Sequence, residues 1–168
     1  MSITPSFSIH LASLAAKPVI AAMFQPCCTE LARFPVEPPL PRDEHGSYLY
    51  PYFDLYWRES VRFPYLLLDG DEVAGFTLVR RDGERWDLSE FYVKPEFRGR
   101  GLGRACATLV VAKHPGAWHI GFNKANRAGR ALWISLAERL SGGRYQHRPV
   151  DAYYECVEFS AAGNDIEE

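Results

Sequence analysis

Residues 98–104 read Arg-Gly-Arg-Gly-Leu-Gly-Arg, with three arginines and with glycine at every second position from 99 to 103. Closely spaced glycines let a backbone turn sharply and approach a ligand. Apolar residues recur at helical spacing after this run, so it should open a helix whose first amides have no partner within the helix. Such amides lie at the positive end of the helix dipole and bind anions such as phosphate. The arginine side chains add charge that matches a polyanion.

The charges of the chain are distributed unevenly around this run. Residues 97–137 contain no Asp or Glu and carry +7, whereas the rest of the chain carries −9 and the whole chain −2. A local positive segment in an acidic chain indicates an anion site. A dinucleotide-binding fingerprint would need Gly or Ala at the position of Cys106. It would also need an acidic residue about 20 positions further on, where this chain has none. The phosphate-loop motif needs Gly-Lys-Ser/Thr, which does not occur in the sequence.

The run at 98–103 does resemble the Arg/Gln-x-x-Gly-x-Gly/Ala signature of the GNAT superfamily of N-acyltransferases, and Tyr92, Val93 and Pro95 precede it as in that family. The resemblance implies an α/β fold of the α+β type. Its sheet would be mixed and mostly antiparallel, with six to seven strands, one parallel strand pair and helices on both faces. The resemblance also implies direct transfer of an acetyl group from acetyl-CoA to a primary amine in a ternary complex, without a metal. The acceptor, a small molecule or a peptide, is not identified.

A second match to the family follows at residues 123–133. Asn126 and Gly129 stand where the family has Asn-x-x-Ala, and Leu132-Trp133 stand at its aromatic pair. In the family this Asn contacts the cofactor, and Asn126 also suits a helix N-cap. The resemblance implies that the backbone of residues 91–93 pairs with the pantetheine arm and that the glycine turn holds the pyrophosphate. The residues predicted to bind the cofactor are Phe91, Tyr92, Val93, Arg98, Gly99, Arg100, Gly101, Leu102, Gly103, Arg104, Asn126, Gly129 and Trp133.

An amine acceptor arrives protonated, so the reaction needs a base. Glu90 and Asp87, on the strand before the turn, are the candidates. They are three positions apart, so regular pleating would place them on opposite faces, although the family often has a bulge near Glu90. We prefer Glu90 because it should lie nearer the thioester. The alternatives are that it is a surface carboxylate, or that His119 serves.

The leaving thiolate also needs a proton. Many family members supply it from a tyrosine at the position of Trp133, whose indole N–H is not a usable acid. Tyr154, Tyr92 and Ser135 are candidate replacements. Water is another, because a free thiol has a pKa of about 8.5 and leaves readily as a thiolate.

Positioning these groups requires a sheet and two helices. Turn residues Asp69-Gly70-Asp71 and Asp82-Gly83 predict a three-stranded antiparallel meander, and a helical crossover predicts a parallel strand after it. At the N-terminus, we expect a helix that Pro26 kinks or splits. The expected strands are 8–12, 63–68, 73–80, 86–93, 117–122, 145–150 and 153–159. Three helices are expected: one over residues 18–34, one that begins at Leu102, and one that follows Asn126 and ends at the glycines after Ser141.

Between the first helix and the meander lie a proline-rich loop and an aromatic run. Four prolines at residues 35–41 exclude regular structure, and six of the ten residues 48–57 are aromatic. The favoured interpretation is a helix that packs its aromatic face on the sheet. The alternative is that some aromatic residues line the acceptor pocket, because this region borders the acceptor in the family.

Length and composition indicate one domain of 168 residues, with residues 1–6 and 161–168 as loose ends. The four cysteines have no metal-site spacing and are expected to be free, buried thiols. No signal peptide or membrane span is evident, so a reducing cytoplasm is the expected location.

Two other functions remain as alternatives. A non-catalytic acyl-CoA-binding regulatory module would explain the missing tyrosine at Trp133. A nucleic-acid-binding protein would use the basic segment, but a net charge of −2 and the lack of a reader motif argue against it. No membrane partner is expected, and the oligomeric state, including a homodimer, is left open.

Overall fold

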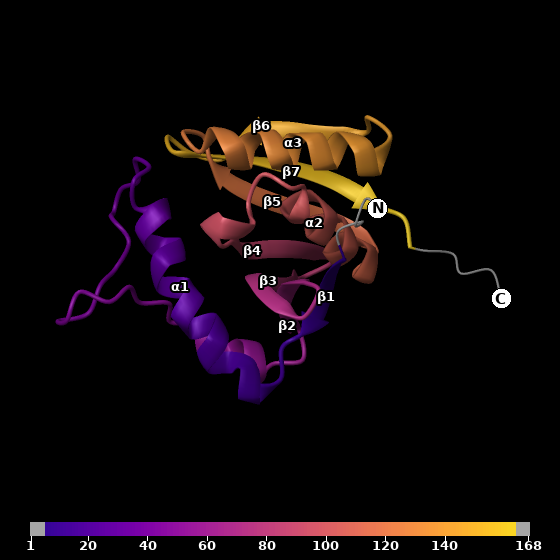
Figure 1. The fold of residues 1–168 in the computed structure, drawn as a ribbon. Coiled ribbons are helices and arrows are strands. Elements are labelled where there is room, and N and C mark those ends of the chain that lie inside the picture. Colours follow the sequence, from indigo (N-terminus) through magenta and orange to yellow (C-terminus); the bar gives the residue numbers. More distant parts are fainter. Residues whose placement is uncertain (1–5, 164–168) are drawn as a thin grey trace.

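A seven-stranded sheet runs through residues 6–163, the part of the chain that this computed structural model describes (Figure 1). The strand order is β1-β2-β3-β4-β5-β7-β6. Neighbouring strands are antiparallel except β4 and β5, which are parallel because a helix crosses over between them. The strands are β1 (Phe7–Leu11), β2 (Arg62–Asp69), β3 (Glu72–Asp82), β4 (Arg85–Val93), β5 (Gly116–Asn123), β6 (Tyr145–Pro149) and β7 (Tyr154–Ala161).

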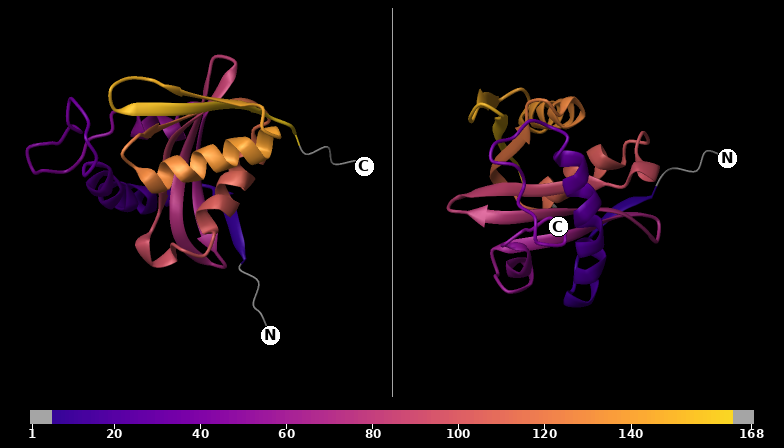
Figure 2. Two further views of the ribbon diagram at one scale, coloured as in Figure 1. Left: turned by 90° about the horizontal axis from the view of Figure 1, so that it is seen from above. Right: turned by 90° about the vertical axis from the view of Figure 1, so that its left-hand side faces the viewer.

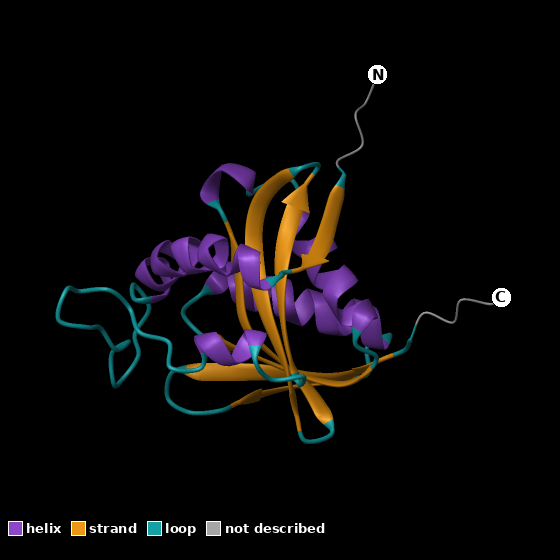
Figure 3. Ribbon diagram, turned by 90° about the horizontal axis from the view of Figure 1, so that it is seen from below, coloured by secondary structure: helices purple, strands orange, loops and turns teal. Residues whose placement is uncertain are grey.

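Helices cover both faces of this sheet (Figures 2 and 3). Helix α1 (Lys17–Leu31) packs on one face, and α2 (Leu102–Lys113) and α3 (Arg127–Ser141) pack on the other. Three short 3-10 turns, η1 (Leu14–Ala16), η2 (Phe53–Trp57) and η3 (Pro95–Phe97), complete the fold. The mixed sheet, its one parallel pair and the two-sided helical cover are those predicted from the sequence. Each predicted strand begins and ends within two residues of its expected bounds.

The core has two main layers because β3 and β4 bury both of their faces. Phe76 and Leu78 on β3 pack against α1, with Ile20 and Phe24. Val79, the next residue along β3, packs toward α2 and α3 on the opposite face. Alternate residues of one strand therefore serve two separate cores.

The N-terminal helix forms where it was predicted, but it ends three residues before the expected Phe34. It is one continuous α-helix that ends at Leu31, with Pro26 inside it, so the proline does not split it in two. Proline removes one backbone hydrogen bond from a helix interior. Buried residues on both sides of Pro26, namely Ile20, Met23, Phe24, Cys27 and Cys28, hold the helix against the sheet and offset that loss.

The aromatic run is not one helix. Only η2 is helical; Tyr48 forms an isolated β-bridge with Arg42, and residues 49–52 are irregular or in a turn. Tyr48 and Tyr56 are buried in the core beneath α1, and Tyr50 stacks on Phe24 with ring centroids 5.3 Å apart. The packing interpretation holds for these rings, although Tyr52 is exposed.

The described part of the chain also tests the expectations for its ends and cysteines. Ala161 is buried at the end of β7, so the C-terminal loose end was predicted to begin too early. Residues 1–5 and 164–168 lie outside the described residues. All four cysteines are free and buried, as predicted. None of the helices within residues 6–163 is long and apolar enough to span a membrane.

Candidate active site

A β-bulge at Ser89 determines where the candidate bases lie. Leu78 of β3 is opposite Glu90, and the next residue, Val79, is opposite Leu88, so Ser89 is the extra residue on β4. A bulge of one residue changes the alternation of side chains along a strand. Asp87 and Glu90 therefore share the face that packs toward α1. The strand does not follow regular pleating, and it has the bulge near Glu90 that the family resemblance suggested.

The two parallel strands separate next to this bulge. Pairing between β4 and β5 covers only residues 85–87 and 117–119, although β4 continues to Val93 and β5 to Asn123. A groove of about 560 Å³ follows the end of β4 and runs past the glycine turn and the start of α3. Of the residues predicted to bind the cofactor, it is lined by Phe91, Tyr92, Val93, Arg98, Gly99, Gly101, Leu102, Gly103, Asn126, Gly129 and Trp133.

The glycine turn contributes Gly99, Gly101, Leu102 and Gly103 to the lining of this groove. Gly99 and Gly101 both have φ = +81°, a left-handed conformation that glycine adopts without strain, and Gly101 is the N-cap of α2. The backbone N–H groups of residues 99–104 donate to no acceptor among the described residues. A methyl group at Gly103 would lie 3.7 Å from the side chains of Phe91 and Val93, so the helix start packs closely on β4. The turn has the unpaired donors and the helix terminus that suit a phosphate group.

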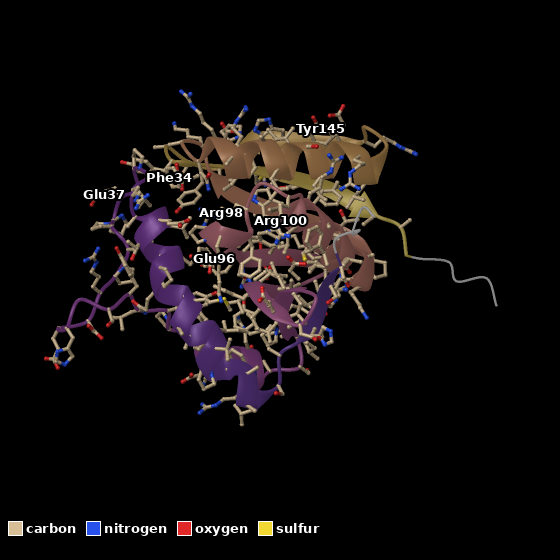
Figure 4. All side chains as sticks on the ribbon, in the orientation of Figure 1. Phe34, Glu37, Glu96, Arg98, Arg100 and Tyr145 are labelled. Atoms are coloured by element: carbon tan, nitrogen blue, oxygen red, sulfur yellow. The ribbon has the colours of Figure 1, made fainter. Side chains whose placement is uncertain are left out.

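The three arginines of the turn lie in different surroundings. Arg98 lines the groove, where Nη2 donates to Glu30 of α1 at 2.7 Å and Nε donates to the Val93 carbonyl at 2.8 Å. Figure 4 shows Arg98 on the turn and Phe34 beyond the end of α1, and both residues line the groove. Arg100 instead pairs with Asp69, and Arg104 lines a shallow hollow beside Phe7. Neither residue lines the groove, so a phosphate there would meet Arg98 first.

The start of α3 forms the opposite wall of the groove. Asn126 caps the helix, with its side-chain oxygen accepting a hydrogen bond from the Gly129 backbone N–H at 3.0 Å. A methyl group at Gly129 would lie 2.8 Å from the Asn126 amide nitrogen, so the capping side chain packs directly against Gly129 and would have to shift for a larger residue. Trp133 packs edge-on against Phe91, with ring centroids 5.0 Å apart at 87°. The two residues join α3 to β4 across the groove.

Glu90 lies in a smaller cavity of about 220 Å³ that adjoins the groove. The two spaces share Leu31, Phe91, Asn126 and Trp133 as lining residues. Burial raises the pKa of the Glu90 carboxyl to about 7. A base works best when its pKa is close to the working pH, so Glu90 has the property that proton abstraction from an amine requires.

Asp87 has the opposite electrostatic character. Burial alone would raise its pKa, but hydrogen bonds from His119 Nδ1 at 3.1 Å and Arg80 Nε at 2.9 Å hold that pKa below its usual value. The carboxylate is therefore a weak base that is already paired. The same hydrogen bond holds His119, which lies on β5, the neighbour of β4 on the side opposite β3.

Of the candidate acids, Tyr154 lies on the cavity that contains Glu90. Burial, followed by the charge of Glu90, raises the pKa of Tyr154, so its phenol keeps its proton at neutral pH. Tyr92 is buried and lines the groove, whereas Ser135 is exposed and lines neither space. Tyr154 is thus the acid candidate that shares the cavity with Glu90.

Possible metal donors occur together at one place among the described residues. His119, Cys156 and Glu158 have donor atoms within 4.8 Å of one another. His119 is bonded to Asp87, and Arg148 pairs with Glu158, so these donors already have partners. That no metal is needed stays a prediction. A larger, more open hollow of about 780 Å³, beside Tyr145 (Figure 4), contains none of the predicted site residues.

The sequence did not indicate that the end of α1 and the proline-rich loop form one side of the cavity. Leu31 at the end of α1, with Val36 and Leu40 from the proline-rich loop, closes the cavity over Glu90. A hydrogen bond from the Asn123 side chain to the Pro35 carbonyl, at 2.8 Å, ties this loop to β5. None of the six aromatic residues at 48–57 lines the groove or this cavity. The only signal was that isolated apolar residues recur within a loop of prolines.

The fold and the site define a class of protein. The chain belongs to the GNAT acetyltransferase family, whose model matches residues 24–136. That match includes the bulged strand, the glycine turn and most of α3.

Particular relatives agree with this assignment. A mycothiol acetyltransferase from Streptomyces avermitilis is 36% identical over 98 residues, which cover 55% of this chain but only 30% of that protein. Two solved structures have the same fold. The ribosomal-protein-S18-alanine N-acetyltransferase of Escherichia coli aligns over 97% of this chain and 100% of its own, with a TM-score of 0.61 at 16% identity. A putative acetyltransferase of Salmonella typhimurium, solved with acetyl-CoA, aligns over 97% and 98%, with a TM-score of 0.64 at 14% identity.

Proposed function

We propose that the protein transfers the acetyl group of acetyl-CoA to an amine by direct attack within a ternary complex. The observation that carries the proposal is Glu90, a carboxyl with a pKa of about 7 in a cavity that adjoins the phosphate-suited groove. The family supports an acetyl donor, and relatives of the same fold have been solved with coenzyme A or acetyl-CoA.

The groove supports binding of the cofactor in two parts. The free amides at residues 99–104 and the guanidinium of Arg98 would hold the pyrophosphate. The edge of β4 beyond Asp87 has no β5 partner, so it would offer backbone groups to the amides of the pantetheine arm. The Val93 carbonyl now accepts from Arg98, and a carbonyl oxygen has a second lone pair to share.

The chemistry then requires three proton transfers. Glu90, about half ionised near pH 7, takes a proton from the ammonium of the acceptor, and the freed nitrogen lone pair attacks the thioester carbonyl carbon. The carbon–sulfur bond breaks, and the thiolate of coenzyme A receives a proton from the Tyr154 hydroxyl or from water. The nitrogen of the new amide gives its second proton to the tyrosinate or hydroxide that results, and Glu90 later releases its proton to solvent. Asp87 takes no proton in this scheme, because Arg80 and His119 stabilise its charged form.

The test is acetyl transfer by the purified chain. Acetyl-CoA binding is measured by calorimetry, and coenzyme A and acetylated amine are both quantified by chromatography with mass detection across a panel of amines. We expect binding and equal amounts of the two products. No binding, or release of coenzyme A without an acetylated amine, would contradict the proposal.

A second function is favoured by one feature, Trp133 in the place of the usual tyrosine. A non-catalytic acyl-CoA-binding module would bind acetyl-CoA in the same groove and acetylate nothing. Replacement by tyrosine separates the two functions. If Tyr154 or water supplies the proton, Trp133→Tyr changes turnover less than about tenfold. If the wild type is inactive and Trp133→Tyr gains turnover, the binding module is the better account.

A further inference from the structure

The cavity around Glu90 constrains the acceptor, given the proposed function on which this inference rests. Loop residues Val36 and Leu40 close the cavity over Leu88 and Glu90 of β4. Its volume of about 220 Å³ is below the roughly 300–1,000 Å³ typical of sites for drug-sized ligands. Part of that space must also hold the acetyl group. Only a small substituent on the reacting nitrogen therefore fits beside Glu90.

The charges of the cavity are as restrictive as its size. Glu90 is the only carboxylic acid among the lining residues of the cavity, which include no Lys, Arg or His. A carboxylate or phosphate on the acceptor would be buried there without a partner, which costs several kcal/mol. A second ammonium would likewise find no carboxylate, because Glu90 is engaged by the reacting amine.

The polar side chains of the cavity are mostly used by the protein itself. Asn123 donates to the Pro35 carbonyl at 2.8 Å and accepts from the Ala125 backbone N–H at 2.9 Å. Asn126 accepts from Gly129 as the cap of α3. Both amides therefore hold the loop and the helix in place. Besides Glu90, Ser89 and Tyr154 are the remaining polar side chains of the lining, and the other lining side chains, among them Leu31, Val36 and Leu40, are apolar.

We propose that the acceptor is an amine whose ammonium is its only charge near the reacting nitrogen and whose carbon substituent is small and apolar. A free apolar amine and the α-amino terminus of a peptide with a small apolar first residue share this chemistry. In both, the ammonium meets Glu90 and the substituent meets the apolar lining that Val36 and Leu40 supply.

The experiment compares matched acceptors with the wild-type protein. Isobutylamine and L-valinamide should have a kcat/KM at least about 100-fold above that of L-valine, which adds a carboxylate. Propylamine should exceed 1,3-diaminopropane at least about tenfold, because the second ammonium is unpaired. A Val-Gly-Gly amide used as well as isobutylamine identifies a peptide terminus as the source, and rejection of that peptide identifies a free amine.

A variant tests whether the lining sets this preference. Val36→Lys places a cation on the cavity wall, and Val36→Met controls for the longer side chain. We expect the ratio of L-valine to isobutylamine turnover to rise at least tenfold in Val36→Lys and to stay within twofold in Val36→Met.

The outcomes separate this inference from the proposed function. Use of L-valine or 1,3-diaminopropane as readily as the matched amines would overturn the inference and leave acetyl transfer intact. Intact acetyl-CoA binding with no turnover of any apolar amine would also overturn it. Loss of acetyl-CoA binding itself would count against the proposed function instead.

Discussion

Replacing Glu90 with Gln should make the protein more stable at alkaline pH and nearly inactive. The folded protein holds the pKa of this carboxyl at about 7, against 4.5 for the ordinary group. Folding therefore favours the protonated form, so the free energy of unfolding falls as pH rises from 4.5 through 7 and is level above that. At about 1.4 kcal/mol for each pKa unit, the loss reaches about 3 kcal/mol by pH 8.

The amide of Gln cannot ionise, so Glu90→Gln is free of this loss. The variant and the wild type should have equal stability at pH 4 and differ by about 3 kcal/mol at pH 8. For a domain of this size the difference corresponds to about 6–12 °C in melting temperature. Urea unfolding at several pH values measures it. Glu44→Gln, at an exposed carboxylate in the loop before β2, is the matched control and should shift stability by less than about 0.5 kcal/mol.

Activity gives the second half of this prediction. Wild-type kcat/KM should rise with pH with an apparent pKa near 7, and Glu90→Gln should lose about 10²–10⁴-fold while acetyl-CoA binds as before. The reasoning is refuted if the variant gains no stability at pH 8, because Glu90 would then not be a desolvated carboxyl. A gain in stability with full activity would show that Glu90 is buried but is not the catalytic base.

Three further predictions concern the groove and the pH range. Gly101→Ala should weaken acetyl-CoA binding at least tenfold by calorimetry, because an L residue at φ = +81° costs about 1–2 kcal/mol and the turn relaxes. Asn126→Ala should lower the free energy of urea unfolding by about 1 kcal/mol, since α3 loses its cap. Burial lowers the pKa of His114 to about 4 from 6.5, so the contribution of His114 to the free energy of unfolding should fall by about 3 kcal/mol as the pH decreases from 6.5 to 4. His114→Gln should remove that fall and lose the 2.8 Å hydrogen bond with Tyr65 at all pH values, which urea titrations at pH 7.5 and 4 would detect.

The glycine turn and the strands around it could be predicted because their signals are local. Asp69-Gly70 and Asp82-Gly83 form the turns of the meander, with positive φ at both glycines. The turn at 98–104 has its chemistry in its own residues, since backbone amides and glycine conformations depend little on distant packing. The parallel pair follows from the chirality of a helical crossover.

The face of Glu90 could not be predicted, because it depends on register rather than on residue type. Nothing in the residue types at 88–90 shows that Ser89 is the unpaired one, and a shift of one position reverses the side of the sheet. The surroundings of the arginines were also beyond the sequence. Both Arg98 and Arg100 were predicted to bind the cofactor, yet Arg98 lines the groove and Arg100 pairs with Asp69 on β2.

The bulge gives the two acids of β4 one face and two different environments. Asp87 lies where β4 and β5 still pair, so His119 of β5 can reach it and its charge is stabilised. Glu90 lies three residues further, where the strands have separated, and apolar loop residues take the place of a cationic neighbour. The separation that opens the groove is thus also what desolvates Glu90. As pH rises from 4.5 to 6.5, ionisation of Glu90 lowers the free energy of unfolding, whereas deprotonation of His114 raises it by a similar amount. Wild-type stability should therefore be nearly constant over this range, and only the Glu90 and His114 variants reveal the two separate contributions.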